Sequence, residues 1–355
     1  MTEKIRVLVV DDSALVRRLV TTALREVPDL EIVGVAKDGV EAVEQVDALE
    51  PDVVTLDIEM PRLDGLGALS RIREGHPRLP VIMFSTLTER GAAATLEALS
   101  RGASDYVTKP SNTGQIADGI AAIREQLVPR IRALVGMRKL APAGRRPEVR
   151  RAPVAAPRRP RTGTPEVLLI GCSTGGPDAL ARLLPQLPAD LGVPVLVVQH
   201  MPPLFTTMLA ERLDRASALT VREAADGDPV LPGEVLIAPG DHHLRVRSVG
   251  GAVRAVLDQG PQENFCRPAV DVLFRSAVEV YGGRALAAVL TGMGHDGLAG
   301  SRQLSEAGAA VLAQDEDSSV VWGMPGAVTM AGLADEVLPL DDLPARIVAA
   351  LRRRP

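Results

Sequence analysis

Short apolar runs alternate with amphipathic stretches along most of this 355-residue chain, and this alternation is the feature that most constrains the fold. Near the N-terminus, IRVLVV precedes the helix-like ALVRRLVTTALREV, then come LEIVGVA and GVEAVEQVDALE, and the pattern continues to about residue 130. Val- and Ile-rich runs without polar alternation are typical of parallel strands buried on both faces. Five such units predict an α/β domain with a doubly wound, flavodoxin-like sheet over residues 1–130.

A second α/β pattern covers residues 165–355. Helix-like segments separate the apolar runs, which read VLLIG, PVLVVQH, VLIAPG, LAAVL and AAVLAQ. An antiparallel hairpin is predicted around Gly250 and Gly251. The chain length also suits two domains. We therefore predict a second doubly wound parallel sheet of Rossmann-like form.

The intervening residues 131–164 break the pattern. They are rich in Pro, Ala and Arg, a composition that predicts an extended linker. The basic run lacks interleaved aromatic residues and the whole chain carries a formal net charge of -5, so we expect no nucleic-acid binding. Two cysteines, no signal-peptide pattern and no apolar run of about 20 residues predict a cytoplasmic protein that does not insert into the membrane.

Chemically useful side chains follow the strands of the first predicted sheet, where open parallel sheets place their sites. They are Asp11, Asp12, Asp57, Ser85 with its neighbour Thr86, and Lys109. Three converging carboxylates suit Mg²⁺, and a carboxylate can also accept a phosphoryl group. Taken singly, each residue also fits a structural role, such as a helix cap or a turn acid. Their repeated position at successive strand ends favours one phosphoryl-transfer site.

The segments IRVLVVDDSALVRRL, DVVTLDIEMPRLDGL, PVIMFST and GASDYVTKPS resemble a response-regulator receiver domain over residues 4 to about 128. The resemblance implies that Asp57 accepts the phosphoryl group and that Mg²⁺ binds Asp11, Asp12, Asp57 and the backbone carbonyl of Glu59. It also implies that Ser85, rather than Thr86, is the switch hydroxyl, that Tyr106 is the switch aromatic residue, and that Lys109 is the family's lysine.

The turn GCSTGGP follows the first strand of the second domain and presents Ser173 in a G-x-S-x-G pattern. Such a turn exposes a nucleophilic hydroxyl, although small residues after a strand also form phosphate-binding turns. His200 and Asp296 follow two further strands, and they supply the base and the orienting acid that an acyl-transfer serine needs. The spacing predicts a Ser173, His200 and Asp296 triad.

Other residues compete for these roles. Cys172 is an alternative nucleophile, His295 an alternative base, and His242 with His243 an alternative substrate or metal site. The order of serine, histidine and acid along the chain differs from that of α/β hydrolases, so we expect a different fold family.

The segments GCSTGGP, QHMPPLF, IAPGDHHL, RPAVDVLFRSA, LTGMGHDG and AQDEDSSVVWGMPGA are similar to the catalytic domain of the CheB family of chemoreceptor glutamate methylesterases. The resemblance implies hydrolysis of glutamate γ-methyl esters and deamidation of glutamines by the triad. Met293 would supply an oxyanion-hole N–H group and Thr174 would lie beside the nucleophile. No cofactor is expected in this domain.

A receiver joined to a hydrolase implies control by phosphorylation. The expected partners are a chemosensory histidine kinase and methyl-accepting chemoreceptors, and we expect the unphosphorylated receiver to block the site. A C-terminal domain that only binds a partner, or one that binds DNA, would represent a different class of function.

Overall fold

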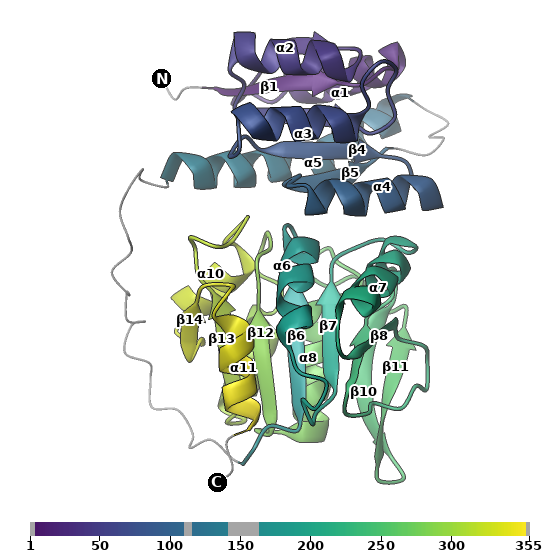
Figure 1. The fold of residues 1–355 in the computed structure, drawn as a ribbon. Coiled ribbons are helices and arrows are strands. Elements are labelled where there is room, and N and C mark those ends of the chain that lie inside the picture. Colours follow the sequence, from purple (N-terminus) through teal and green to yellow (C-terminus); the bar gives the residue numbers. More distant parts are fainter. Residues whose placement is uncertain (1–3, 110–115, 141–162, 353–355) are drawn as a thin grey trace. The chain divides into compact units, whose positions relative to one another are not determined.

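The computed structural model describes residues 4–109, 116–140 and 163–352, and the chain divides at Pro142 into two compact units (Figure 1). Among these residues, no helix combines the length and the hydrophobicity needed to cross a membrane.

The N-terminal unit contains a parallel sheet with strand order β2-β1-β3-β4-β5. The strands are β1 (Ile5–Val10), β2 (Leu30–Ala36), β3 (Val53–Asp57), β4 (Val81–Ser85) and β5 (Asp105–Thr108). The helices are α1 (Ala14–Arg25), α2 (Gly39–Leu49), α3 (Gly65–Gly75), α4 (Glu89–Ser100) and α5 (Ile116–Leu140). Strands β3 and β4 are buried throughout, which explains why their residues are mainly apolar.

Helix α5 continues past residue 130, where the sequence pattern predicted the domain to end, and reaches Leu140. Most of the predicted linker, residues 141–162, lies outside the described residues. The predicted domain boundaries therefore remain a prediction.

The C-terminal unit contains a parallel sheet with strand order β14-β13-β12-β6-β7-β9-β8. The strands are β6 (Val167–Cys172), β7 (Val195–Gln199), β8 (Thr220–Glu223), β9 (Glu234–Ile237), β12 (Ala285–Val289), β13 (Ala310–Gln314) and β14 (Glu336–Leu338). After β6 the chain adds β7, β8 and β9 on one side of it, and afterwards β12, β13 and β14 on the other side. Strand β6 therefore stands at the topological switch point. In such sheets the ligand site lies beyond the carboxyl ends of the strands at this point.

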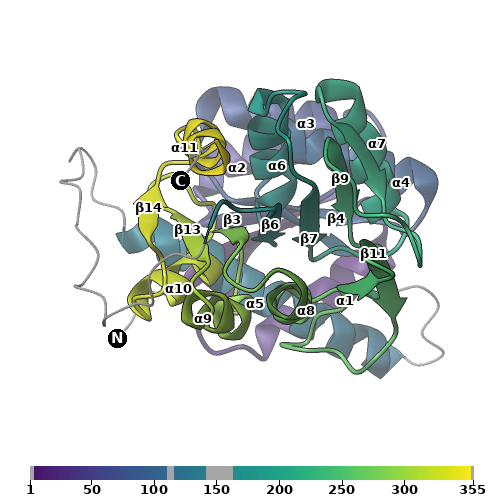
Figure 2. The same ribbon diagram turned by 90° about the horizontal axis from the view of Figure 1, so that it is seen from below.

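Helices cover both faces of this sheet (Figure 2). One face carries α6 (Gly176–Leu183), α7 (Phe205–Ala216) and α11 (Leu343–Leu351), and the other carries α8 (Val270–Tyr281), α9 (Leu298–Glu306) and α10 (Met324–Met330). The predicted hairpin is present as β10 (His243–Val249) and β11 (Ala252–Asp258), which pair antiparallel. The predicted fold class, two doubly wound parallel sheets, is confirmed.

Prolines mark the boundaries of two helices. Helix α6 ends at Leu183, and a 3₁₀ turn (Leu184–Gln186) containing Pro185 follows. Helix α7 begins at Phe205, after Pro202 and Pro203. The short edge strands β8 and β14 were not predicted, since only one of their residues, Val221, is buried.

Candidate active site

Three neighbouring strands of the C-terminal sheet position the predicted triad. Strand β6 lies between β7 and β12, and Ser173, His200 and Asp296 follow these strands at their carboxyl ends. Cys172 pairs with Gln199 in the register of β6 and β7, so Ser173 and His200 leave the sheet at the same level. The structure thus brings together three residues that are far apart in the sequence.

Ser173 stands in a turn held by its neighbours. Its N–H donates to the Thr291 carbonyl (3.0 Å), and its own carbonyl accepts from Gln199 Nε2 (3.0 Å). Gly175 follows with a φ of 77°, a left-handed conformation that glycine adopts without a steric cost. A Cβ atom at Gly292 would lie 2.8 Å from Ser173 Cβ, so only glycine allows this second turn to pack against the serine.

The predicted oxyanion residues lie in these two turns. Met293 follows Gly292 and is half-buried, while Thr174 is buried beside the serine and its carbonyl accepts from Thr291 Oγ1 (2.9 Å). The turn of Met293 therefore passes next to the nucleophile, as an oxyanion-hole donor must.

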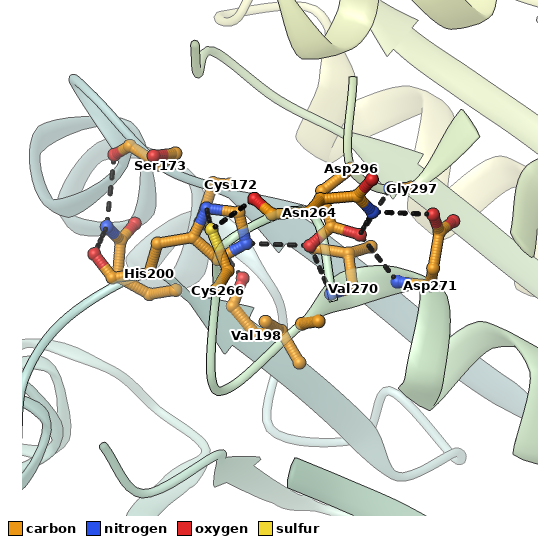
Figure 3. A network of polar contacts seen from close by, with 12 residues as sticks. Cys172, Ser173, Val198, His200, Asn264, Cys266, Val270, Asp271, Asp296 and Gly297 are labelled. Carbon is orange, nitrogen blue, oxygen red and sulfur yellow. Dashed lines mark hydrogen bonds and ion pairs between the residues drawn. The ribbon is translucent and has the colours of Figure 1, made fainter. Parts of the chain in front are cut away.

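His200 and Asp296 form a pair in which the carboxylate is buried and the imidazole keeps a small exposed area. His200 Nε2 lies 2.8 Å from Asp296 Oδ2, which leaves Nδ1 as the nitrogen that can accept a proton from a hydroxyl (Figure 3). Nδ1 faces Cys266 Sγ at 3.4 Å, and among the described residues no hydrogen bond joins Ser173 Oγ to the imidazole. Catalytic hydrogen bonds of free enzymes often form only once substrate is bound.

Asp296 is held as a carboxylate by a dense set of donors. It accepts from the backbone N–H groups of Val270 (2.6 Å) and Asp271 (3.0 Å), at the start of α8, from the N–H of Gly297 (2.9 Å), and from Asn264 Nδ2 (3.0 Å). Burial opposes ionisation, but the hydrogen bond from His200 and these N–H groups lower the pKa of Asp296. In return, although burial disfavours the imidazolium, the hydrogen bond to Asp296 raises the pKa of His200.

The competing residues of the C-terminal unit lie elsewhere or are chemically unsuited. Cys172 is fully buried and its thiol donates to the Val198 carbonyl (3.7 Å), and burial raises the pKa of this thiol. His295 is exposed, and in the described part of the chain the carboxylate of Asp296 pairs with the ring of His200 instead. His243 Nε2 bonds to the Pro261 carbonyl (3.0 Å) and His242 Nδ1 to that of Gly240 (3.2 Å), which are structural contacts.

Sequence reasoning missed three residues that surround the pair. Asn264 and Cys266 contact Asp296 and His200, and Asp271 accepts from Asn264 Nδ2 (3.0 Å). Asn264 and Cys266 lie in the long connection between β11 and α8, which has no periodic pattern. The length of this irregular connection was the available signal, because long loops in compact domains are often functional.

A second cluster lies at the carboxyl ends of β1, β3 and β5. Asp11, Asp12 and Asp57 each offer a carboxylate oxygen, all within 4.8 Å of one another. Lys109 Nζ lies 2.9 Å from Asp11 Oδ2 and 2.8 Å from Asp57 Oδ1. Burial and the neighbouring Asp11 charge raise the pKa of Asp57 to about 6, although Lys109 opposes this effect.

The remaining predicted receiver residues surround this cluster. Ser85 ends β4 and is buried, with Oγ 3.1 Å from the Gly91 carbonyl, whereas Thr86 Oγ1 bonds to Thr88 Oγ1 (3.1 Å). Tyr106 is buried in β5, and burial raises its pKa. The exposed side chain of Glu59 pairs with Arg90 (3.3 Å). The predicted ligand atom of Glu59 is its backbone carbonyl oxygen, which this ion pair does not involve.

Comparisons with known proteins match both units. The family described as CheB methylesterase matches residues 168–347, and the response regulator receiver domain matches residues 7–121. A protein-glutamate methylesterase/protein-glutamine glutaminase of Nocardioides sp. is 54% identical over 99% of this chain and 96% of its own length. The protein of the same name from Trichodesmium erythraeum is 48% identical over 97% and 98%. The crystal structure of the Thermotoga maritima CheB methylesterase catalytic domain, 45% identical, covers 52% of this chain and 98% of that domain with a TM-score of 0.52.

Proposed function

The chain belongs to the CheB methylesterase family, and we propose that Ser173, His200 and Asp296 are its catalytic residues. The activity is that of a phosphorylation-regulated protein-glutamate methylesterase and protein-glutamine glutaminase in chemotaxis. The observation that carries the residue assignment is the hydrogen-bonded pair of His200 and Asp296 at the same sheet edge as Ser173, at the switch point of the sheet.

The proposed reaction begins when a receptor glutamate γ-methyl ester brings Ser173 Oγ within reach of His200 Nδ1. Oγ attacks the ester carbonyl carbon, and its proton moves to Nδ1, while Asp296 stabilises the imidazolium through Nε2. The Met293 N–H and the turn around Thr174 surround the oxyanion. The tetrahedral intermediate collapses, the methoxy group takes the proton from Nδ1, and methanol leaves. Water then hydrolyses the acyl-enzyme with the same proton route in reverse, and a glutamine substrate releases ammonia instead.

In the receiver domain, we propose Asp57 as the phospho-acceptor, with a chemosensory histidine kinase as the phosphodonor. The residues present fit Mg²⁺, since Asp57 Oδ2 is buried without a hydrogen-bond partner in the described part of the chain, next to the carboxylates of Asp11 and Asp12. Asp11, Asp12, Asp57 and the Glu59 carbonyl would hold the ion, which when bound neutralises charge on the transferred phosphoryl group. Lys109 lies where its ammonium would contact a phosphoryl oxygen on Asp57. Ser85 and Tyr106 are proposed as the switch residues.

The substrate partners under this proposal are methyl-accepting chemoreceptors, and the location is the cytoplasm, where the kinase and the receptor segments would meet the enzyme. No cofactor is assigned to the esterase domain, because serine acyl chemistry needs only the side chains described.

Replacing Asp57 with asparagine tests the regulatory site. We expect acetyl phosphate with Mg²⁺ to stimulate methanol release by the wild type and to leave the Asp57→Asn variant at its basal rate, because an amide does not form the acyl phosphate. Asp52→Asn makes the same change at a half-buried carboxylate that directly precedes β3 and accepts from the Arg6 N–H (2.9 Å); it serves as the control and keeps the stimulation. Undiminished stimulation in Asp57→Asn would mean that another residue accepts the phosphoryl group.

Magnesium binding by the carboxylate cluster gives a separate prediction. We expect 10 mM MgCl₂, relative to NaCl of equal ionic strength, to raise the Tm of the receiver transition by roughly 2–5 °C, because the ion binds only the folded site. Asp12→Asn removes one carboxylate without disturbing the ion pairs of Lys109, and it should abolish most of this shift. Calorimetry measures the effect, and an equal shift in Asp12→Asn would contradict the ligand assignment.

A further inference from the structure

A tight turn lies against the catalytic pair. Glu263 and Cys266 exchange backbone hydrogen bonds, with N to O distances of 3.1 and 2.8 Å, so Asn264 and Phe265 form a two-residue turn between them. Both central residues have positive φ, 52° for Asn264 and 63° for Phe265. Turns of this kind usually carry Asn followed by Gly, because the left-handed conformation is costly for a side chain with a large Cβ substituent.

The turn is attached to the active site on both sides of Phe265. Asn264 Nδ2 lies 3.0 Å from Asp296 Oδ1, and Cys266 Sγ lies 3.4 Å from His200 Nδ1 (Figure 3). Glu263 forms an ion pair with Arg275 of α8, which anchors the base of the turn. The position of Phe265 is therefore fixed relative to the two catalytic side chains.

Phe265 does not contribute to the packing of the protein. Its exposed fraction is 97%, the highest among the large apolar side chains that the structure leaves exposed. The chain's other three phenylalanines, Phe84, Phe205 and Phe274, are at most 2% exposed. An aromatic side chain that is neither buried nor suited to its backbone conformation destabilises the fold, and such residues are characteristic of functional sites.

We propose that Phe265 binds an apolar surface of the receptor segment that carries the methyl ester, and thereby selects protein substrates. This inference rests on the proposed function of Ser173, His200 and Asp296. Any glutamyl ester that reaches the triad must bring its flanking residues next to this turn, because the turn contacts both His200 and Asp296. An exposed aromatic ring beside a reaction centre offers a large contact area at a low entropic cost, as the anchors of protein interfaces do.

The test compares two substrates in the full-length chain activated with acetyl phosphate. Membranes carrying a methylated chemoreceptor provide the protein substrate, and 4-nitrophenyl acetate provides an ester without flanking residues. In Phe265→Gly we expect the ratio of the receptor kcat/KM to the small-ester kcat/KM to fall about tenfold, mainly through KM of the receptor. The Tm should rise by roughly 2 °C, because glycine relieves the left-handed conformation. If Phe265 instead stabilised the fold, the Tm of Phe265→Gly would fall below that of the wild type.

Val249→Ala is the matched control, since Val249 is 46% exposed at the β10–β11 hairpin and belongs to neither site. It should leave the ratio unchanged. An unchanged ratio in Phe265→Gly, or a tenfold loss with both substrates together, would overturn the proposal. An increased small-ester rate without acetyl phosphate would also overturn it, because the ring would then contact the receiver. A wrong assignment of the triad would be recognised separately, because Ser173→Ala would then retain activity on both the receptor and 4-nitrophenyl acetate.

Discussion

Replacing Ser173 with alanine is expected to reduce methanol release from methylated receptor by at least about 10,000-fold, or about 5.5 kcal/mol of transition-state stabilisation. The serine supplies the attacking oxygen from the end of β6, and the Cys266 thiol, which lies 3.4 Å from His200 Nδ1, is the alternative nucleophile to be tested. A residual rate near 1% in Ser173→Ala would indicate that Cys266 acts as a second nucleophile. A double variant with Cys266→Ser would identify that route.

Cys172 provides the matched control for this experiment. It precedes Ser173 in the same turn, but it is fully buried and its thiol donates to the Val198 carbonyl. Cys172→Ala should keep kcat within about threefold while lowering the free energy of unfolding by roughly 1 kcal/mol, because it leaves a small cavity. If Cys172→Ala lost activity while Ser173→Ala stayed active, Cys172 rather than Ser173 would be the nucleophile.

Much of the catalytic centre could be predicted because parallel strands deliver their last residues to one edge. Ser173, His200 and Asp296 each follow an apolar run, so their convergence required only that β6, β7 and β12 be neighbours. The same logic brought Asp11, Asp57 and Lys109 together in the receiver. These predictions rest on local periodicity, which the sequence displays directly.

The contacts around the histidine could not be predicted in this way. Asn264 and Cys266 reach the pair from an irregular connection, and their positions depend on the paired backbone of Glu263 and Cys266 rather than on any repeat. The use of Nε2 for Asp296 is a further property of three-dimensional packing. Propensity and spacing contain no information on which ring nitrogen faces which neighbour.

The position of Asp296 explains why this carboxylate stays ionised in a buried site. The first N–H groups of α8, at Val270 and Asp271, donate to it, and these donors would otherwise lack partners. Asp271, the next acid on that helix, is also buried, and burial raises its pKa. Two adjacent buried carboxylates therefore differ in protonation preference, because only Asp296 pairs with the imidazole.

Replacing Asp296 with asparagine should lower kcat by about 1,000- to 10,000-fold, because the amide neither stabilises the imidazolium nor fixes the ring. The pH profile gives a second readout. In the wild type the ionised Asp296 favours protonated His200 and raises its pKa above 6.5, while the reaction needs the neutral base. Activity therefore rises as pH increases through this raised pKa. In Asp296→Asn the acid limb of log kcat/KM should move to lower pH.

Asp271→Asn is the matched control, since it makes the same carboxylate-to-amide change next to Asp296. Its carboxylate accepts from Gly300 N–H and from Asn264, and among the described residues it forms no hydrogen bond with His200. It should retain at least about one tenth of the wild-type kcat. Its acid limb should stay in place or move only slightly to lower pH, because the hydrogen bond between His200 and Asp296 is kept and the loss of a more distant negative charge disfavours the imidazolium only weakly. If the limb moved equally in both variants, the titrating group would respond to the total charge of the pocket rather than to the hydrogen bond between His200 Nε2 and Asp296. If the acid limb of log kcat/KM did not move in Asp296→Asn, the titrating group would be one other than His200.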